Sequence, residues 1–527
     1  MKKTTELVRK GLLAVLGNPG IYALAAFVVT GMFTSGVLAE YRSILELNLI
    51  IPWGLALCLL QLERRSQRGE TPVRLDICVL FVLYVWLVAT FMLRFGPTDN
   101  NIATWHNHAI IFFGIYALGS SMEEKRLGRT MDAALALGAA VSFVFCGALL
   151  LAAVRGQGSN DPNEFGFGVF MQSHLCSGAH YNTTGMLAMC CSFLCLAGMA
   201  RAGKRGMKLL YAVPAIMAMV VTVLSQSRTA RYSLLAGLAA GCYGMLASGR
   251  FHRRALVRHA AGLLAAAVVL AGGYLASNSL TNAALAWYAR TGTAQQEEAE
   301  EAYTEEYVYL GTYEDGLHAG YEYGYWEGFD AGYTEAGGDI EAFKAEWIQR
   351  MQEQAAADAE QEEPVQVYQD AVEMNKARSA GEGSFTGRTD VWKNILRMWM
   401  EEPKYMLIGN GMGRTSRDIL VGTPLEGIGA NQAHNTYLQF IMDYGLIGFV
   451  LLCVFFALIV PHAWRVFFAA PGTAAAGSRA MCMLVIACLM TGMMESDPLG
   501  AMRPSNVMLV YAMTCIAGAG RSMEKRK

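Results

Sequence analysis

Apolar segments of about 17 to 25 residues recur along this chain, and an α-helix of that length crosses the hydrocarbon core of a bilayer. Hydrophobic side chains make up 54% of the 527 residues and charged ones only 16%, which is unusual for a soluble protein of this size. We therefore expect an all-α polytopic membrane protein with about twelve transmembrane helices. The expected spans lie near residues 15–39, 44–62, 76–93, 104–122, 131–154, 184–200, 207–225, 232–248, 256–276, 437–460, 480–495 and 504–520.

Basic residues are distributed unevenly between the connections of these spans. If the N-terminus is cytoplasmic, 25 of the 42 lysines and arginines fall in the inward-facing segments. The positive-inside rule then predicts that both termini are cytoplasmic and that the long segment 277–436 lies outside. The first apolar run is too long for a typical signal peptide, so we expect it to remain as a membrane anchor.

This topology predicts three regions. Residues 1–276 form an N-terminal membrane region of about nine spans, residues 277–436 a large extracytoplasmic helical loop, and residues 437–527 a C-terminal region of about three spans. Within the loop, residues 295–373 are an acidic insertion rich in Tyr and Gly, and residues 383–436 lead back to the membrane. Residues 386–400 are typical of an amphipathic helix.

The acidic insertion allows several interpretations. From Gly316 to Gly332 a glycine recurs every four residues, interleaved with tyrosine, tryptophan and phenylalanine. A solvated helical arm that packs on itself is the simplest interpretation. Stacking of the aromatic side chains on sugar rings is a second one. Metal binding by the carboxylates is a third, although no spacing resembles that of an EF-hand.

The short outward turn Ser225–Arg231 carries two arginines against the inside bias, Arg228 and Arg231. Arginine stays charged and offers a planar fork that binds phosphate in bidentate fashion, so these residues are candidates for binding an anionic substrate. Snorkelling of the two side chains to lipid headgroups is the alternative.

His434 and Asn435 lie at the mouth of a predicted span, directly after the large loop. The neutral imidazole of a histidine can accept a proton at physiological pH, so His434 could activate a hydroxyl group. A histidine at a helix end can also serve only in capping or packing. The chain has no Cys/His cluster at zinc spacing, no Gly-x-Ser-x-Gly elbow and no Walker loop, which argues against metal, serine hydrolase and ATPase chemistry.

Several motifs together resemble the O-antigen ligase and polymerase family of bacterial membrane glycosyltransferases. The pair His434-Asn435 is followed by nine residues and then by Gly445-x-x-Gly448. Ser227-Arg228 is similar to the Ser-Arg element that opens the shared domain of that family. The remaining similar elements are Thr386-Gly387-Arg388-Thr389-Asp390-Val391-Trp392, Leu407-Ile408-Gly409-Asn410-Gly411, and the single residues Asn182 and Glu495. The resemblance covers roughly residues 155–500, and the acidic insertion departs from the family pattern.

The resemblance implies a fold like that of the GT-C class of glycosyltransferases and a glycan-transfer reaction at the outer leaflet of the bacterial plasma (inner) membrane. The donor is a glycan on a polyprenyl diphosphate, and the acceptor is a hydroxyl of a lipid, a glycan or a protein. No metal, cofactor or nucleic acid is expected to take part.

The resemblance also implies roles for individual residues. Arg228 and Arg388 would stabilise the diphosphate leaving group. His434 would take the acceptor proton in a single displacement, which predicts inversion at the anomeric carbon. The residues expected to bind donor or acceptor are Arg231, Asn435, Arg414, Asn182 and Glu495.

A polytopic polysaccharide or lipid transporter or flippase is the main alternative. Transporters often show related halves and charged or broken helices at the membrane midplane. Here the halves are unequal and the polar residues gather at one membrane edge, which favours the enzyme. A sensor built around the acidic loop is a further alternative, and ligase and polymerase activities stay undistinguished.

Overall fold

The computed structural model describes residues 14–32, 36–68, 74–95, 105–155, 158–159, 167–171, 174–177, 181–248, 255–300, 388–409, 433–469, 473–495 and 503–525. The chain divides into two compact units. The first comprises Met1–Ala284 and Phe385–Lys527, and the second comprises Leu285–Ser384. Residues 285–300 are the described part of the second unit and continue a long helix. The predicted glycine repeat between Gly316 and Gly332 lies outside the described residues.

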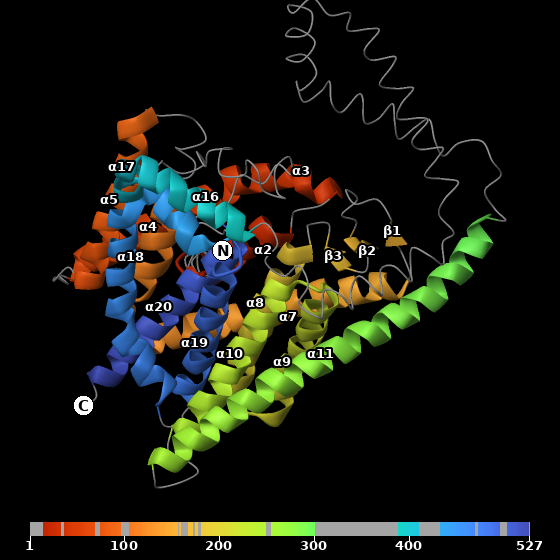
Figure 1. Cartoon of the computed structure of the whole chain (residues 1–527). Coiled ribbons are helices and arrows are strands. Elements are labelled where there is room, and N and C mark those ends of the chain that lie inside the picture. Colours follow the sequence, from red (N-terminus) through yellow and green to blue (C-terminus); the bar gives the residue numbers. More distant parts are fainter. Residues whose placement is uncertain are drawn as a thin grey trace, which may run out of the picture. The chain divides into compact units, whose positions relative to one another are not determined.

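Helices make up nearly all of the described chain (Figure 1). The helices before the small sheet are α2 (Pro19–Met32), α3 (Gly36–Leu45), the π-helical η1 (Glu46–Ile50), α4 (Ile51–Arg68), α5 (Leu75–Phe95), the π-helical η2 (Ile110–Ala117) and α7 (Glu124–Val154). The central helices are α8 (Tyr181–Arg201), α9 (Arg205–Leu224), α10 (Arg228–Ala247) and α11 (Ala255–Glu300). The last ones are α16 (Arg388–Glu401), α17 (Pro403–Ile408), α18 (Thr436–Phe467), α19 (Thr473–Gly492) and α20 (Pro504–Glu524).

The prediction of an all-α polytopic membrane protein is confirmed in its coarse form. Every apolar segment expected from the sequence contains helix. Within the described residues, six helices are long and apolar enough to cross a membrane, and three apolar helices are shorter. The amphipathic helix expected over residues 386–400 is α16.

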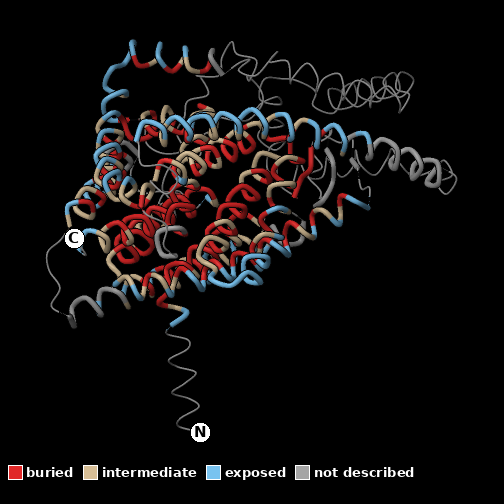
Figure 2. Tube along the Cα trace, turned by 90° about the horizontal axis from the view of Figure 1, so that it is seen from below, coloured by how far each residue is buried: buried red, intermediate tan, exposed pale blue. Residues whose placement is uncertain are grey.

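Helix α8 lies at the centre of the bundle and packs against α7, α9, α10 and α19. In the most apolar 18-residue stretch of α8, 72% of the residues are buried, compared with 11% in the corresponding stretch of α11. Figure 2 shows the buried residues gathered in the interior of the bundle. Helix α19 packs against α8, α10 and α20, and α18 packs against α5, α19 and α20.

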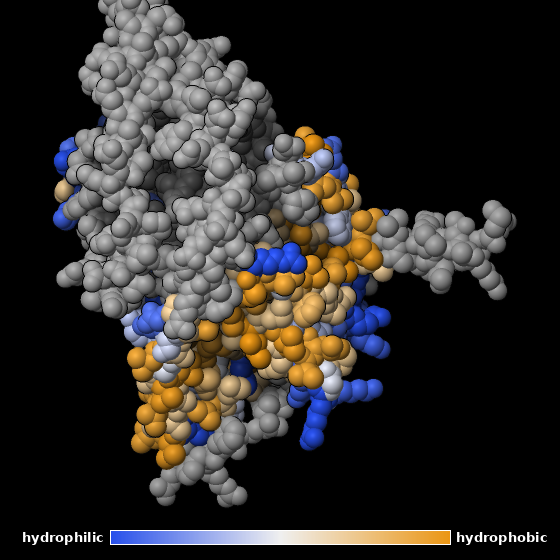
Figure 3. All heavy atoms as spheres, turned by 90° about the vertical axis from the view of Figure 1, so that its right-hand side faces the viewer, coloured by the Kyte–Doolittle hydropathy of each residue, from blue (hydrophilic) through white to orange (hydrophobic). Residues whose placement is uncertain are grey.

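Large apolar side chains cover much of the outer surface of the described helices. Figure 3 shows such a face, with hydrophilic residues in small separate groups. The most exposed ones on α11 include Leu256, Leu264 and Leu275, at 83%, 67% and 65% exposure. Apolar surface of this extent is expected where helices face lipid rather than water.

A small sheet, which the sequence analysis did not predict, lies in the connection between α7 and α8. Its order is β1 (Gly158–Ser159), β2 (Phe167–Met171) and β3 (His174–Ser177), with β1 parallel and β3 antiparallel to β2. Pairing between the strands gives hydrogen-bond partners to backbone groups of the described part of this connection.

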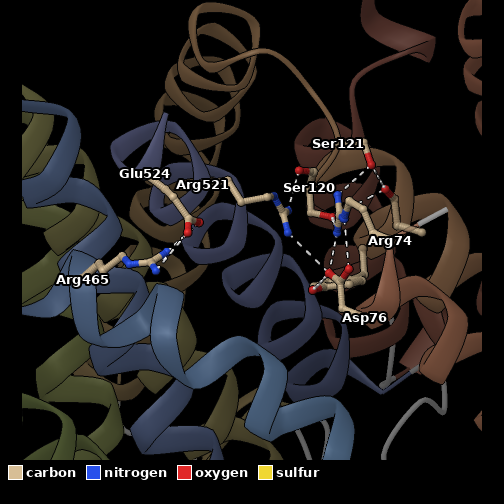
Figure 4. A network of polar contacts seen from close by, with 9 residues as sticks. Arg74, Asp76, Ser120, Ser121, Arg465, Arg521 and Glu524 are labelled. Carbon is tan, nitrogen blue, oxygen red and sulfur yellow. Dashed lines mark hydrogen bonds and ion pairs between the residues drawn. The ribbon is translucent and has the colours of Figure 1, made fainter. Parts of the chain in front are cut away.

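A polar network joins the ends of α5 and α20 (Figure 4). The carboxylate of Asp76 accepts hydrogen bonds from the guanidinium groups of both Arg74 and Arg521. Nearby, Arg465 Nη1 lies 2.7 Å from Glu524 Oε2, which ties the end of α18 to the end of α20. The network therefore fixes the bundle at the end where α18 and α20 finish.

Candidate functional site

Four helix ends meet around the carboxylate of Glu495, which follows the last turn of α19. Its Oε1 atom accepts a hydrogen bond of 3.0 Å from Asn182 Nδ2, at the start of α8. Thr229 Oγ1, in the first turn of α10, lies 3.4 Å from the same atom. The second oxygen, Oε2, lies 3.8 Å from His434 Nδ1, just before α18. Asn182, His434 and Glu495, all expected to be functional, therefore lie together.

His434 and Glu495 form a pair that is largely shielded from solvent. Their side chains are 18% and 14% exposed. The distance of 3.8 Å is too long for a hydrogen bond, and His434 Nδ1 is buried without a hydrogen-bond partner among the described residues. Catalytic hydrogen bonds are often long before substrate binds and shorten in the complex. A small movement of either side chain would let the carboxylate orient the imidazole.

The backbone at His434 has a positive φ of 47°, in the left-handed region that a residue other than glycine rarely adopts. Such a conformation costs free energy and persists only when the surrounding structure enforces it, and these conformations cluster at functional sites. Among the described residues, the other non-glycine residue with positive φ is Gln226, at 51°, in the predicted Ser225–Arg231 turn.

Asn435 caps α18 and thereby fixes the residue that follows His434. Its Oδ1 atom accepts from the backbone N–H groups of Tyr437 and Leu438, which is the usual role of an N-cap side chain. Its Nδ2 atom donates to the carbonyl oxygen of Met493 at 3.3 Å. The start of α18 is thus tied to the end of α19, so Asn435 holds the backbone next to His434 in place.

Arg228 is the first residue of α10 and lies half-buried beside Thr229. Ser227 caps this helix by accepting from the N–H of Ala230. The turn packs so tightly on α8 that a Cβ atom at Gly185 would come within 2.6 Å of Ser225 Oγ. The N-termini of α8, α10 and α18 therefore converge near Arg228, and each carries partial positive charge that favours an anion.

Arg231, expected to bind substrate, serves a different contact. Its Nη1 atom donates to Asn278 Oδ1 at 3.0 Å, and its guanidinium lies 5.8 Å from the ring centres of both Tyr232 and Tyr274. Only 8% of the residue is exposed. Arg231 therefore joins α10 to α11 and is not part of the group around Glu495.

Arg388 is the first residue of α16, and its side chain lies outside the described residues. One helical turn further on, Trp392 Nε1 donates to the carbonyl oxygen of Ala433 at 2.8 Å. The start of α16 is therefore held next to the residue that precedes His434. Arg414 lies outside the described residues, so its predicted role stays a prediction.

The two glycine elements of the sequence pack backbone to backbone. Helix α18 is broken at Gly445, where φ is 71°. A Cβ atom at Gly409, at the end of α17, would come within 2.5 Å of the carbonyl oxygen of Asp443. The break frees the carbonyl of Tyr444, which accepts a hydrogen bond of 2.7 Å from Trp86 Nε1 on α5. The glycines are needed for this close approach, because larger residues would hold the two segments apart.

Sequence reasoning missed Thr229, Gln439 and Asp443 as contributors to the site. Gln439 and Asp443 are 5% and 2% exposed and lie four residues apart on α18. Their spacing in an apolar segment was the available signal, because buried polar residues in membrane helices tend to be functional. Among the described residues, no group of three His, Cys, Asp or Glu side chains could hold a metal ion.

Comparison with protein families matches residues 213–453 to O-antigen ligase. The match bears out the predicted resemblance to the O-antigen ligase and polymerase family. The matched O-antigen ligase segment contains Arg228, Arg388 and His434, whereas Asn182 and Glu495 lie outside it. No curated protein matches the chain. The fold brings the O-antigen ligase segment and these two outlying residues together at one site.

Proposed function

We propose that this protein transfers a glycan from a polyprenyl-diphosphate carrier to an acceptor hydroxyl at the outer leaflet, as an O-antigen ligase-like enzyme or as a polysaccharide polymerase. The observation that carries the proposal is the approach of His434 Nδ1, in the segment that matches O-antigen ligase, to within 3.8 Å of Glu495 Oε2, which the fold brings in from outside that segment. A base next to a carboxylate at the end of membrane helices suits activation of a hydroxyl group.

His434 takes the proton from the acceptor hydroxyl in this mechanism. The acceptor oxygen forms a bond to the anomeric carbon, and the bond from that carbon to the phosphate oxygen breaks on the opposite side. The diphosphate leaves with the electron pair, so a single displacement inverts the configuration. Glu495 holds the imidazole with its Nδ1 protonated, which leaves Nε2 to accept the proton.

The leaving diphosphate is stabilised by positive charge. Arg228 begins α10, and Arg388 begins α16, which is held near His434 through Trp392. The converging N-termini of α8, α10 and α18 add partial positive charge in a site with little water. This charge replaces the role that a metal ion has in other transferases, so transfer needs no metal.

The site lies on the outer side of the membrane in this proposal. Helix α18 begins at Thr436, directly after His434 and Asn435, and ends at Phe467, near Arg465. The site and the network of Arg74, Arg465 and Arg521 therefore lie at opposite ends of this helix. Basic residues concentrate on the cytoplasmic side of membrane proteins. The arginine-rich end is then cytoplasmic, as are both termini, and the large loop is outside.

The test uses a strain that lacks this protein, complemented with the wild type or with His434→Ala, each checked for insertion into the membrane. The surface polysaccharide is analysed for chain length and for its carrier. We expect His434→Ala to insert normally and to leave glycan on the lipid carrier. Single repeat units on the carrier identify a polymerase, and long unattached chains identify a ligase. Normal surface glycan with His434→Ala would refute the proposal.

A further inference from the structure

Ala433, which directly precedes His434, has both of its backbone groups bound to side chains. Its N–H donates to Gln439 Oε1 at 2.9 Å, and its carbonyl oxygen accepts from Trp392 Nε1 at 2.8 Å. The residue is fully buried and packs in a cluster with Val391 of α16. The N–H and the carbonyl of Ala433 belong to the two successive peptide units that flank this residue. Each unit is therefore held by one hydrogen bond, and the bond from Trp392 holds the unit that leads into His434.

The peptide unit on the other side is fixed as well, because Asn435 caps α18. His434 lies between these two anchored residues with a φ of 47°. A histidine in the left-handed region is unfavourable by itself, and it persists only where neighbouring interactions over-determine the backbone. The contacts of Ala433 and Asn435 supply that constraint, and the constraint sets the direction in which the imidazole leaves the backbone.

The amide of Gln439 can point in only one direction. A backbone N–H is a donor only, so Gln439 must turn its oxygen toward Ala433. Its Nε2 atom then faces Asp443 and donates to Oδ1 at 3.0 Å. A carboxylate accepts such a bond, so Asp443 stabilises the one orientation of Gln439 that Ala433 requires.

We propose that Gln439 and Asp443 are positioning residues, which hold Ala433 and thereby aim the imidazole of His434 at Glu495. The inference rests on the proposed role of His434 as the base. It assigns a function to two buried polar groups in an apolar helix, where polar groups without a role are disfavoured.

The test compares Gln439→Leu with Gln439→Glu and with a matched control, Met442→Leu. Leucine removes the acceptor for the Ala433 N–H. Glutamate restores an acceptor, provided that the new carboxyl shares a proton with Asp443, as carboxylate pairs do. Met442 is fully buried on the same helix and makes no hydrogen bond to Ala433. Its replacement by leucine conserves volume and should have little effect.

Two quantities are measured on protein in lipid nanodiscs: hydrogen exchange of the Ala433 amide, and kcat and KM for transfer from a synthetic polyprenyl-diphosphate glycan. We expect Gln439→Leu to speed exchange about 10-fold, because one buried hydrogen bond is lost. We expect it to lower kcat about 100-fold at unchanged KM, since a misplacement of about 1 Å has that effect on a catalytic group. Gln439→Glu should restore the slow exchange of the Ala433 amide and the wild-type kcat. The recovery should be fuller at pH about 6 than at pH about 8, because the two carboxyl groups must share a proton.

Faster exchange with unchanged kcat would overturn the positioning role, and unchanged exchange in Gln439→Leu would overturn the hydrogen-bond relay itself. Equal losses in Met442→Leu would also overturn it, because they would reflect general packing. If the wild type transfers no glycan, the proposed function fails instead, and the exchange data still decide whether the relay holds the backbone at His434.

Discussion

The negative charge of Glu495 should raise kcat substantially, and Glu495→Gln tests this because it removes the charge with almost no change in the shape of the side chain. Asn182 and Thr229 both donate to Oε1. The carbonyl oxygen of a glutamine would keep these two partners. Its amide nitrogen would then face His434 Nδ1, which must give up its proton to accept that hydrogen bond. The imidazole is thereby left in the tautomer that has no lone pair on Nε2.

The magnitude follows from the distance between the two groups. When His434 takes the acceptor proton it becomes positively charged, 3.8 Å from the carboxylate. At an effective dielectric constant near 20, this attraction is about 4 kcal/mol. Both side chains keep partial contact with solvent, which screens the attraction further, so we take about 2 kcal/mol as its lower value. These energies correspond to a fall in kcat between roughly 30-fold and 1,000-fold.

The assay measures kcat for glycan transfer by the purified protein in nanodiscs at saturating donor. Glu524→Gln is the matched control, because it also removes one carboxylate but lies at the other end of α18, paired with Arg465. We expect this control to keep the wild-type kcat. A Glu495→Gln protein that keeps the wild-type kcat as well would refute the argument that the carboxylate assists His434.

Three further predictions concern the packing and the ion pairs of the helix bundle. Gly445→Ala should prevent stable insertion into the membrane, because the backbone has a φ of 71° there and the added Cβ would meet backbone atoms of α17. Gly206→Ala should be tolerated, because a Cβ at that position meets nothing within 4 Å, and the yield of folded protein after solubilisation compares the two variants. Trp86→Phe should lower stability by about 1–3 kcal/mol, since it leaves the carbonyl at the helix break without its donor, and thermal unfolding measures the loss. Asp76→Ala should lower the free energy of unfolding by about 3–5 kcal/mol, because the largely buried Arg74 and Arg521 lose their carboxylate partner. Glu524→Ala removes a more exposed carboxylate and should lower it by less than about 1 kcal/mol, so equal melting temperatures of the two variants would contradict this prediction.

The helices could be predicted because hydropathy and amphipathicity are local properties. The apolar segments contain the expected helices, and α16 (Arg388–Glu401) covers most of the run from Thr386 to Met400. The break at Gly445 could not be predicted, because it depends on the approach of α17, a distant segment. The strands between Gly158 and Ser177 were missed because they are short and because their residues do not alternate between apolar and polar, which is the sequence signal for a strand.

The candidate site was predicted in part. His434 and Asn435 could be found because polar residues at the mouth of an apolar helix are unusual. The hydrogen bond between Asn182 and Glu495 joins residues 313 positions apart, so only the fold could bring these two together. Arg231 was predicted to bind phosphate from its local sequence, and this role stays a prediction. The structure adds a contact that the sequence did not indicate, the hydrogen bond to Asn278 on α11.

In the proposed function, this protein moves a glycan from a lipid diphosphate to a hydroxyl with His434 as the base. The most direct measurement incubates the purified protein in nanodiscs with a defined polyprenyl-diphosphate glycan and an acceptor, in the presence of a chelator. Release of free polyprenyl diphosphate and the anomeric configuration of the product are then recorded. We expect the wild type to release the lipid diphosphate and to invert the anomeric configuration, and we expect His434→Ala to release it at least about 100-fold more slowly. Retention of configuration, or equal rates for the two proteins, would contradict it.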